Sequence, residues 1–156
     1  MMRGDEGSGP LLRRGLLWLA GLVTVGIAVD LAADRHWTQP VQVIAWAALV
    51  LTGVAALLVG RPTRTRLQVA RALVALVIVA SVLGVWEHVE SNYDAGELDY
   101  VYADAWGGLS EPNRWWLALS KTVGPSPPFA PGALAQAALC VLLATVRHPA
   151  LRRETA

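Results

Sequence analysis

Residues 41–60 read VQVIAWAALVLTGVAALLVG, and this stretch decides the fold. It contains no charged side chain, and Gln42 and Thr52 are its only clearly polar residues. About 20 predominantly apolar residues are what a helix needs to cross the hydrocarbon layer of a membrane. A helix is required, because lipid offers no hydrogen-bond partner to backbone N–H and C=O groups. The stretch therefore predicts a transmembrane helix.

Three further apolar stretches, residues 15–33, 67–86 and 131–146, have the same character. The chain of 156 residues is 54% hydrophobic and 16% charged, and so small a soluble protein has too little interior for so much apolar surface. No stretch alternates every second residue, as a half-buried strand would. We therefore expect an all-α polytopic membrane protein. Its single four-span domain, a four-helix bundle over residues 13–149, lies between cytoplasmic tails at residues 1–12 and 150–156.

The basic residues indicate how the four spans are oriented. Ten of the 13 Lys and Arg residues flank the spans on one side, and that side also holds both termini. Because basic residues accumulate in cytoplasmic loops, we expect both termini to be cytoplasmic and the protein to lie in the cell membrane. The ten are Arg3, Arg13, Arg14, Arg61, Arg64, Arg66, Arg71, Arg147, Arg152 and Arg153.

A cleaved signal peptide is the alternative interpretation of the first apolar stretch. Arg13 and Arg14 precede a short apolar run, as they would in such a signal. Leu31, however, fits poorly two positions before a cleavage after Ala33, where a small residue is usual. Cleavage would leave three spans rather than four.

The connection of residues 87–130 on the outer side is unusually long for a loop without structure or purpose. Residues 87–96 continue the third span as a helix that Gly96 ends, and residues 110–121 read as a second, short helix. Trp115 and Trp116 make this short helix apolar enough to lie in the membrane interface, which indole rings prefer.

Acidic and histidine side chains gather where the third span reaches this connection. Glu87, Glu90 and Asp94 are spaced i, i+3, i+7 and so form one stripe on a helix. A cation would relieve the repulsion among their carboxylates. Glu87, His88, Glu90 and His36 are thus candidate ligands for a metal ion at the outer face. The alternatives are an ion-pair cluster, or polar residues at a helix end that headgroups and water simply solvate.

The second half of the chain also resembles a known family. The segments GVWEHVESNY (residues 84–93), PPFAPG (residues 127–132) and TVRHP (residues 145–149) are similar to those of small, uncharacterised bacterial four-helix integral membrane proteins. The likeness covers about residues 83–149. It implies the same topology, assigns no reaction, and makes His88 and Asn92 the first positions of the connection to test.

No catalytic motif occurs in the chain, no cofactor is predicted, and we expect neither an enzyme nor a nucleic-acid partner. A non-enzymatic accessory protein fits best, embedded in the lipid bilayer and binding a membrane protein through its outer connection. A metal- or cation-binding protein is one alternative, and a small oligomeric transporter or channel is another. The absence of ionisable residues at mid-span argues against ion-coupled transport. The candidate binding residues are Asn92, Asp94, Trp115 and Trp116.

Overall fold

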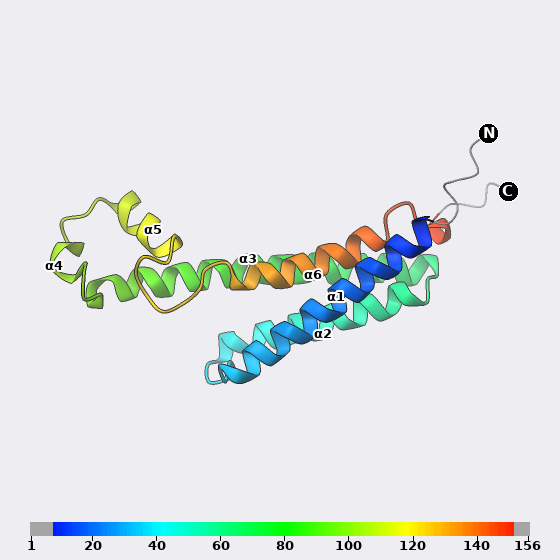
Figure 1. Ribbon diagram of the computed structural model, residues 1–156, viewed down its shortest axis with the longest axis horizontal. Helices are drawn as coiled ribbons and strands as arrows, with labels where there is room; N and C mark the ends of the chain where they lie inside the picture. Colours follow the sequence, from blue (N-terminus) through cyan, green and yellow to red (C-terminus); the bar gives the residue numbers. More distant parts are fainter. Residues whose placement is uncertain (1–7, 152–156) are drawn as a thin grey trace. The chain divides into compact units, whose positions relative to one another are not determined.

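A computed structural model describes residues 8–151, in which helices are joined by turns and short loops, with no strand among these residues. The all-α expectation is therefore confirmed for this range. The helices are α1 (Ser8–Ala33), α2 (Val43–Gly60), α3 (Arg64–Ala95), α4 (Ala103–Trp106), α5 (Glu111–Leu119) and α6 (Ala130–Ala144), as Figure 1 shows. Short 3₁₀ turns occupy η1 (Pro40–Gln42), η2 (Gly96–Leu98) and η3 (Pro149–Leu151).

Three of the helical segments are long and apolar enough to cross a membrane. They are Gly9–Ala33, Pro40–Gly60 and Arg64–Leu98, with 25, 21 and 35 residues. Such segments in one chain indicate a membrane protein. Helix α6 is also apolar, but its 15 residues give a rise of only about 22 Å, so a fourth span stays a prediction.

The ends of the chain differ in part from the expected tails. Helix α1 begins at Ser8, within the segment expected to precede the first span, and η3 extends to Leu151. The remaining tail positions, residues 1–7 and 152–156, lie outside the described residues.

The chain divides into two compact units. The bundle unit comprises residues up to Ala80 together with those from Ala133 onward, and the loop unit comprises Ser81–Gly132. Helix α3 contributes to both units, because the boundary after Ala80 falls inside it.

The bundle unit has its core along a stripe on each of two helices. In α3 the buried residues recur every three or four positions, which places them on one face. Helix α6 presents a similar buried stripe, and the two stripes belong to one apolar cluster with residues of α1 and α2. Many of these side chains are alanine, which allows membrane helices to approach closely. The stripes are Leu67, Ala70, Val74 and Val77 in α3, and Leu134, Ala138, Val141 and Ala144 in α6.

Arg71 joins the start of α3 to the end of α6 within the bundle unit. Its Nε donates to Oγ1 of Thr145 at 2.9 Å, and its Nη2 donates to the backbone carbonyl of Thr145 at 3.2 Å. The last carbonyls of a helix lack partners within it and carry partial negative charge, so a guanidinium is a suitable partner. Helices α3 and α6 therefore run antiparallel.

Candidate functional site

The connection expected as an outer loop folds around an apolar core of its own. Val89 of α3, Trp106 of α4, Ala118 of α5 and Val123 are buried together in the loop unit. Trp106 is the largest of them and is 2% exposed. The loop unit is therefore a small folded body, which positions the side chains on its surface.

Gly96 allows Trp106 to enter this core. Helix α3 runs as far as Ala95, and Gly96 opens the 3₁₀ turn that follows, so the expected helical extension ended by Gly96 is confirmed. A Cβ atom at Gly96 would lie 2.3 Å from the Trp106 ring, a distance that real side chains do not adopt. Glycine is thus the residue that fits here.

Asn92, a candidate binding residue, is fully buried and uses its carboxamide inside the loop unit. Its Nδ2 donates to the carbonyls of Ala118 at 3.1 Å and Ser126 at 2.7 Å. Its Oδ1 accepts the N–H of Ser126 at 2.8 Å. The carboxamide pairs with the backbone of Ser126 as another peptide group would. It thereby holds residues 124–127, the return segment, against α3.

Two neighbouring contacts strengthen this attachment. Gly124 has a positive φ of 78°, and a Cβ atom there would lie 2.4 Å from Oδ1 of Asn92. Nδ1 of His88 lies 2.7 Å from the carbonyl oxygen of Pro127, a distance at which a protonated Nδ1 donates to that oxygen. Three side-chain or backbone features therefore fix residues 124–127 on one face of α3.

The short helix expected over residues 110–121 is present as α5, and an aromatic stack holds it. Trp115 stacks on Tyr93 with 4.4 Å between ring centroids and on Trp86 at 5.4 Å. The hydroxyl of Tyr93 donates to the carboxylate of Glu111 at 3.0 Å. Trp115 is half-buried by this stack, whereas the neighbouring Trp116 is 65% exposed.

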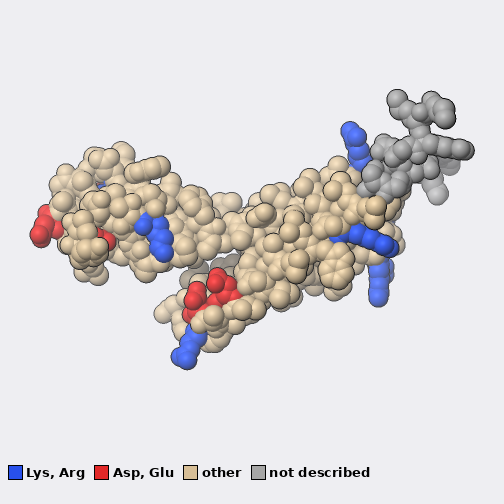
Figure 2. Space-filling model, in the orientation of Figure 1, with Lys and Arg blue, Asp and Glu red and all other residues tan. Residues whose placement is uncertain are grey.

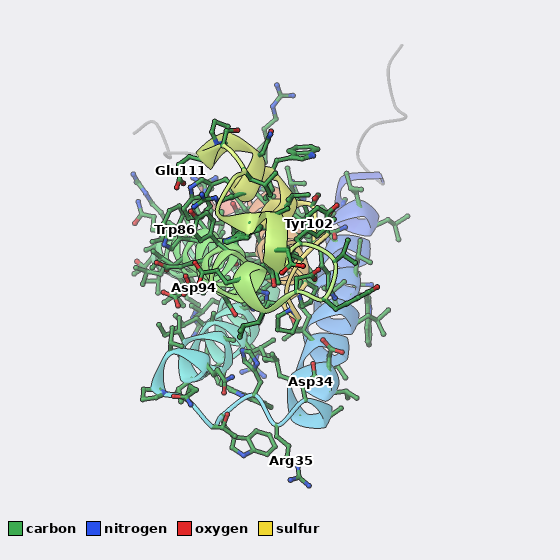
Figure 3. All side chains as sticks on the ribbon, turned by 90° about the vertical axis from the view of Figure 1, so that its left-hand side faces the viewer. Asp34, Arg35, Trp86, Asp94, Tyr102 and Glu111 are labelled. Carbon is green, nitrogen blue, oxygen red and sulfur yellow. The ribbon has the colours of Figure 1, made fainter. Side chains whose placement is uncertain are left out.

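The candidate metal ligands come from both compact units. Glu87, Glu90 and Asp94 are exposed on α3, and Figure 3 shows Asp94 on that helix. His36 belongs to the bundle unit, where its backbone carbonyl accepts the indole N–H of Trp46 at 2.8 Å, whereas His88 belongs to the loop unit. Among residues 8–151, no group of three or more His, Cys, Asp or Glu side chains is arranged to hold a metal ion.

An exposed apolar tip begins at the last residue of η2 and ends before α4, and sequence reasoning did not single it out. The apolar tip consists of Leu98, Tyr100 and Val101, which are 86%, 97% and 59% exposed. The carboxylate of Asp99 accepts the N–H of Val101 at 2.9 Å and that of Tyr102 at 3.2 Å. Such a turn holds the backbone of the tip in place.

The surroundings of the apolar tip are acidic. The loop unit contains seven acidic and two basic residues. Glu97 and Asp104 are exposed close to the tip in sequence, on either side of it. The loop unit therefore presents an apolar centre among negative charges.

Compared with protein-family models, with curated proteins and with solved structures, the chain matches none.

Proposed function

We propose that this protein is a non-enzymatic, multi-pass protein of the cell membrane whose loop unit docks a partner membrane protein on the outer side. It crosses the membrane four times, with both termini cytoplasmic. The observation that carries the proposal is the apolar tip, which is held on a folded acidic unit.

The distribution of charge on the bundle unit supports the orientation. Arg13, Arg14, Arg61 and Arg64 lie where α1 begins, α2 ends and α3 begins, whereas Asp30 and Asp34 lie near the turn between α1 and α2. Figure 2 shows basic side chains on the visible face of the bundle unit, at the end where α1 begins and α2 ends. Basic residues favour the cytoplasmic side.

The packing of α6 supports the fourth span. Its buried stripe faces that of α3 in one core, and Arg71 pairs with its carboxyl end. A helix packed along a membrane-crossing neighbour lies at the same depth in the bilayer. Helix α6 is shorter than the hydrocarbon layer, and a short span is accommodated by local thinning of the bilayer.

Helix α5 is the proposed interfacial element of the loop unit. Trp115 faces the aromatic stack, whereas Trp116 is exposed. An exposed indole on a short helix is well suited to the headgroup region, which solvates its polar N–H and its apolar ring together.

The apolar tip has the composition of a docking site for a protein. Burying Leu98, Tyr100 and Val101 against a partner would remove apolar surface from water, the main favourable term in protein association. The acidic residues around the tip would steer a partner that carries basic residues beside an apolar pocket. The same charges repel anionic lipid, which favours a protein over the membrane surface as the occupant.

Site-specific photocrosslinking in native membranes tests the docking proposal. A photoreactive residue replaces Tyr100 in one variant and the exposed Thr122 in a control variant. We expect a discrete protein adduct from position 100 and none from position 122. The adduct should be lost when Leu98→Ser and Val101→Ser are combined, because the apolar contact is gone.

The matched control for that loss is Phe129→Ser, since Phe129 is 68% exposed in the same unit but outside the tip. This change should leave the adduct intact. Adducts with lipid alone at position 100, or equal adducts at both positions, would refute docking through the tip. Reporter tags at the two ends that respond to opposite compartments would refute the four-span orientation.

A further inference from the structure

A groove opens at the end of the bundle unit where α1 begins and α2 ends. Its volume is about 280 Å³. A water molecule occupies about 30 Å³ in the liquid, so the groove has room for a polar headgroup. Among the residues that line it are Arg13, Arg14, Leu17, Val59, Gly60 and His148.

The charges that line the groove are all positive, since no acidic residue contributes to its wall. Arg13 is half-buried, and its Nη2 donates to the carbonyl of Arg147 at 3.3 Å, which holds the guanidinium at the wall. Arg14 is exposed beside it. Guanidinium groups match the geometry of phosphate oxygens and bind them through paired hydrogen bonds.

His148 adds a neutral donor to the same wall. Its Nδ1 lies 3.1 Å from the backbone N–H of Ala150, from which it accepts a hydrogen bond. In the neutral ring the proton then resides on Nε2, which is a donor. The groove thus combines two guanidinium groups with an imidazole ring, while Leu17 and Val59 provide an apolar wall.

We propose that this groove binds the phosphate group of an anionic phospholipid, with part of an acyl chain against Leu17 and Val59. Basic pockets between membrane helices bind acidic headgroups in this way. The apolar wall favours a lipid over soluble phosphate, because inorganic phosphate has nothing to place there. The site is independent of the apolar tip, so either proposal can fail without the other.

Native mass spectrometry on the full-length protein in detergent tests the site. The protein is titrated with phosphatidylglycerol and, separately, with phosphatidylcholine of the same acyl chains. We expect the anionic lipid to bind more tightly. Arg14→Gln should weaken that binding about fivefold, and Arg13→Gln with Arg14→Gln about 25-fold, from the usual contribution of one arginine to anionic-lipid binding.

Two matched controls separate the groove from general charge and from misfolding. Arg64→Gln removes one exposed charge at the start of α3, outside the groove, and should change the affinity little. Gly60 lines the groove, so Gly60→Leu fills it at unchanged net charge. A Cβ atom at Gly60 meets nothing within 4 Å, so the protein should accommodate the larger side chain. Gly60→Leu should weaken binding about as much as Arg14→Gln does. Gly53→Leu in the same helix is equally open and should not.

Three results would overturn the proposal. One is equal affinity for the anionic and the zwitterionic lipid. Another is an equal loss from Arg64→Gln and Arg14→Gln, which would mean attraction by overall charge. The third is binding of inorganic phosphate alone, sensitive to Arg14→Gln, with no binding of phosphatidylglycerol, which would assign the groove to a soluble phosphate.

Discussion

Replacing Asn92 by alanine should release the return segment of the loop unit from α3. The change removes three hydrogen bonds, two donated to the carbonyls of Ala118 and Ser126 and one accepted from the N–H of Ser126. A buried hydrogen bond contributes about 1 kcal/mol net, so we expect the local free energy of opening to fall by about 3 kcal/mol. The side chain is 0% exposed, so water does not replace these partners in the folded state.

Hydrogen exchange read by mass spectrometry measures this opening directly. A decrease of about 3 kcal/mol in the free energy of local opening accelerates exchange on the order of 100-fold when reclosing is fast. The acceleration should be confined to peptides covering residues 117–127. Asn113→Ala is the matched control, since Asn113 is exposed on α5, and it should leave exchange unchanged. Acceleration below about threefold for Asn92→Ala would refute the attachment that we describe.

Asn92→Asp gives a second, pH-dependent check. At neutral pH its carboxylate would face the carbonyl oxygens of Ala118 and Ser126. In the native protein these oxygens accept hydrogen bonds from Nδ2 of Asn92. Burial and this repulsion would raise the pKa of the introduced carboxyl above that of the unfolded chain. The folded state then binds more protons, so stability falls as pH rises through this range and recovers as pH is lowered. If the free energy of local opening of Asn92→Asp, measured by hydrogen exchange, is the same at low and at neutral pH, this prediction is wrong.

Three other substitutions test features of both units. Gly124→Ala places a Cβ atom at a positive φ of 78° against the buried carboxamide and should destabilise the loop unit by about 2 kcal/mol. Near-UV circular dichroism during thermal unfolding would report this, and Gly107→Ala, where the space is open, should show no change. Arg71→Leu removes both hydrogen bonds to Thr145 and should cost about 2 kcal/mol of bundle stability; an unaltered melting temperature in detergent would rule out that role. Burial, and then the charge of a neighbouring arginine, lower the pKa of His148 below its usual 6.5. The unfolded chain therefore protonates His148 at a higher pH than the folded protein does. The free energy of unfolding should fall as the pH drops below the unfolded value of 6.5. His148→Asn should reduce that slope, and an identical slope in melting temperature against pH would contradict it.

The features that the sequence predicts are those that depend on neighbours along the chain. Residues 41–60 predict a helix from their uninterrupted apolar character, and α2 occupies Val43–Gly60. The extension of α3 ends where Gly96 follows it, and α5 begins directly after Ser110, which has the extended backbone of an N-cap residue. Apolar length, helix-ending glycine and capping residues act locally, so one sequence is enough to locate them.

The features that escaped prediction depend on contacts between residues far apart in the chain. Asn92 pairs with Ser126, 34 residues away, and no local pattern indicates that partner. Its side chain was a candidate for binding, and the structure engages it within the protein. The apolar tip went unnoticed because exposure depends on which residues the fold buries. The candidate metal ligands His36 and His88 belong to different compact units, and a shared metal site stays a prediction.

Helices α3 and α6 lie close together where the chain enters and leaves the loop unit. Pro131 lies so near Gly84 that a Cβ atom at Gly84 would meet the proline ring at 3.0 Å. The first turn of α6 thus packs against α3 at Gly84, so the chain enters and leaves the loop unit at neighbouring points, as in a domain inserted into a helical hairpin. A different folded domain could therefore replace the loop unit at these points without a change in the length or direction of α3 and α6.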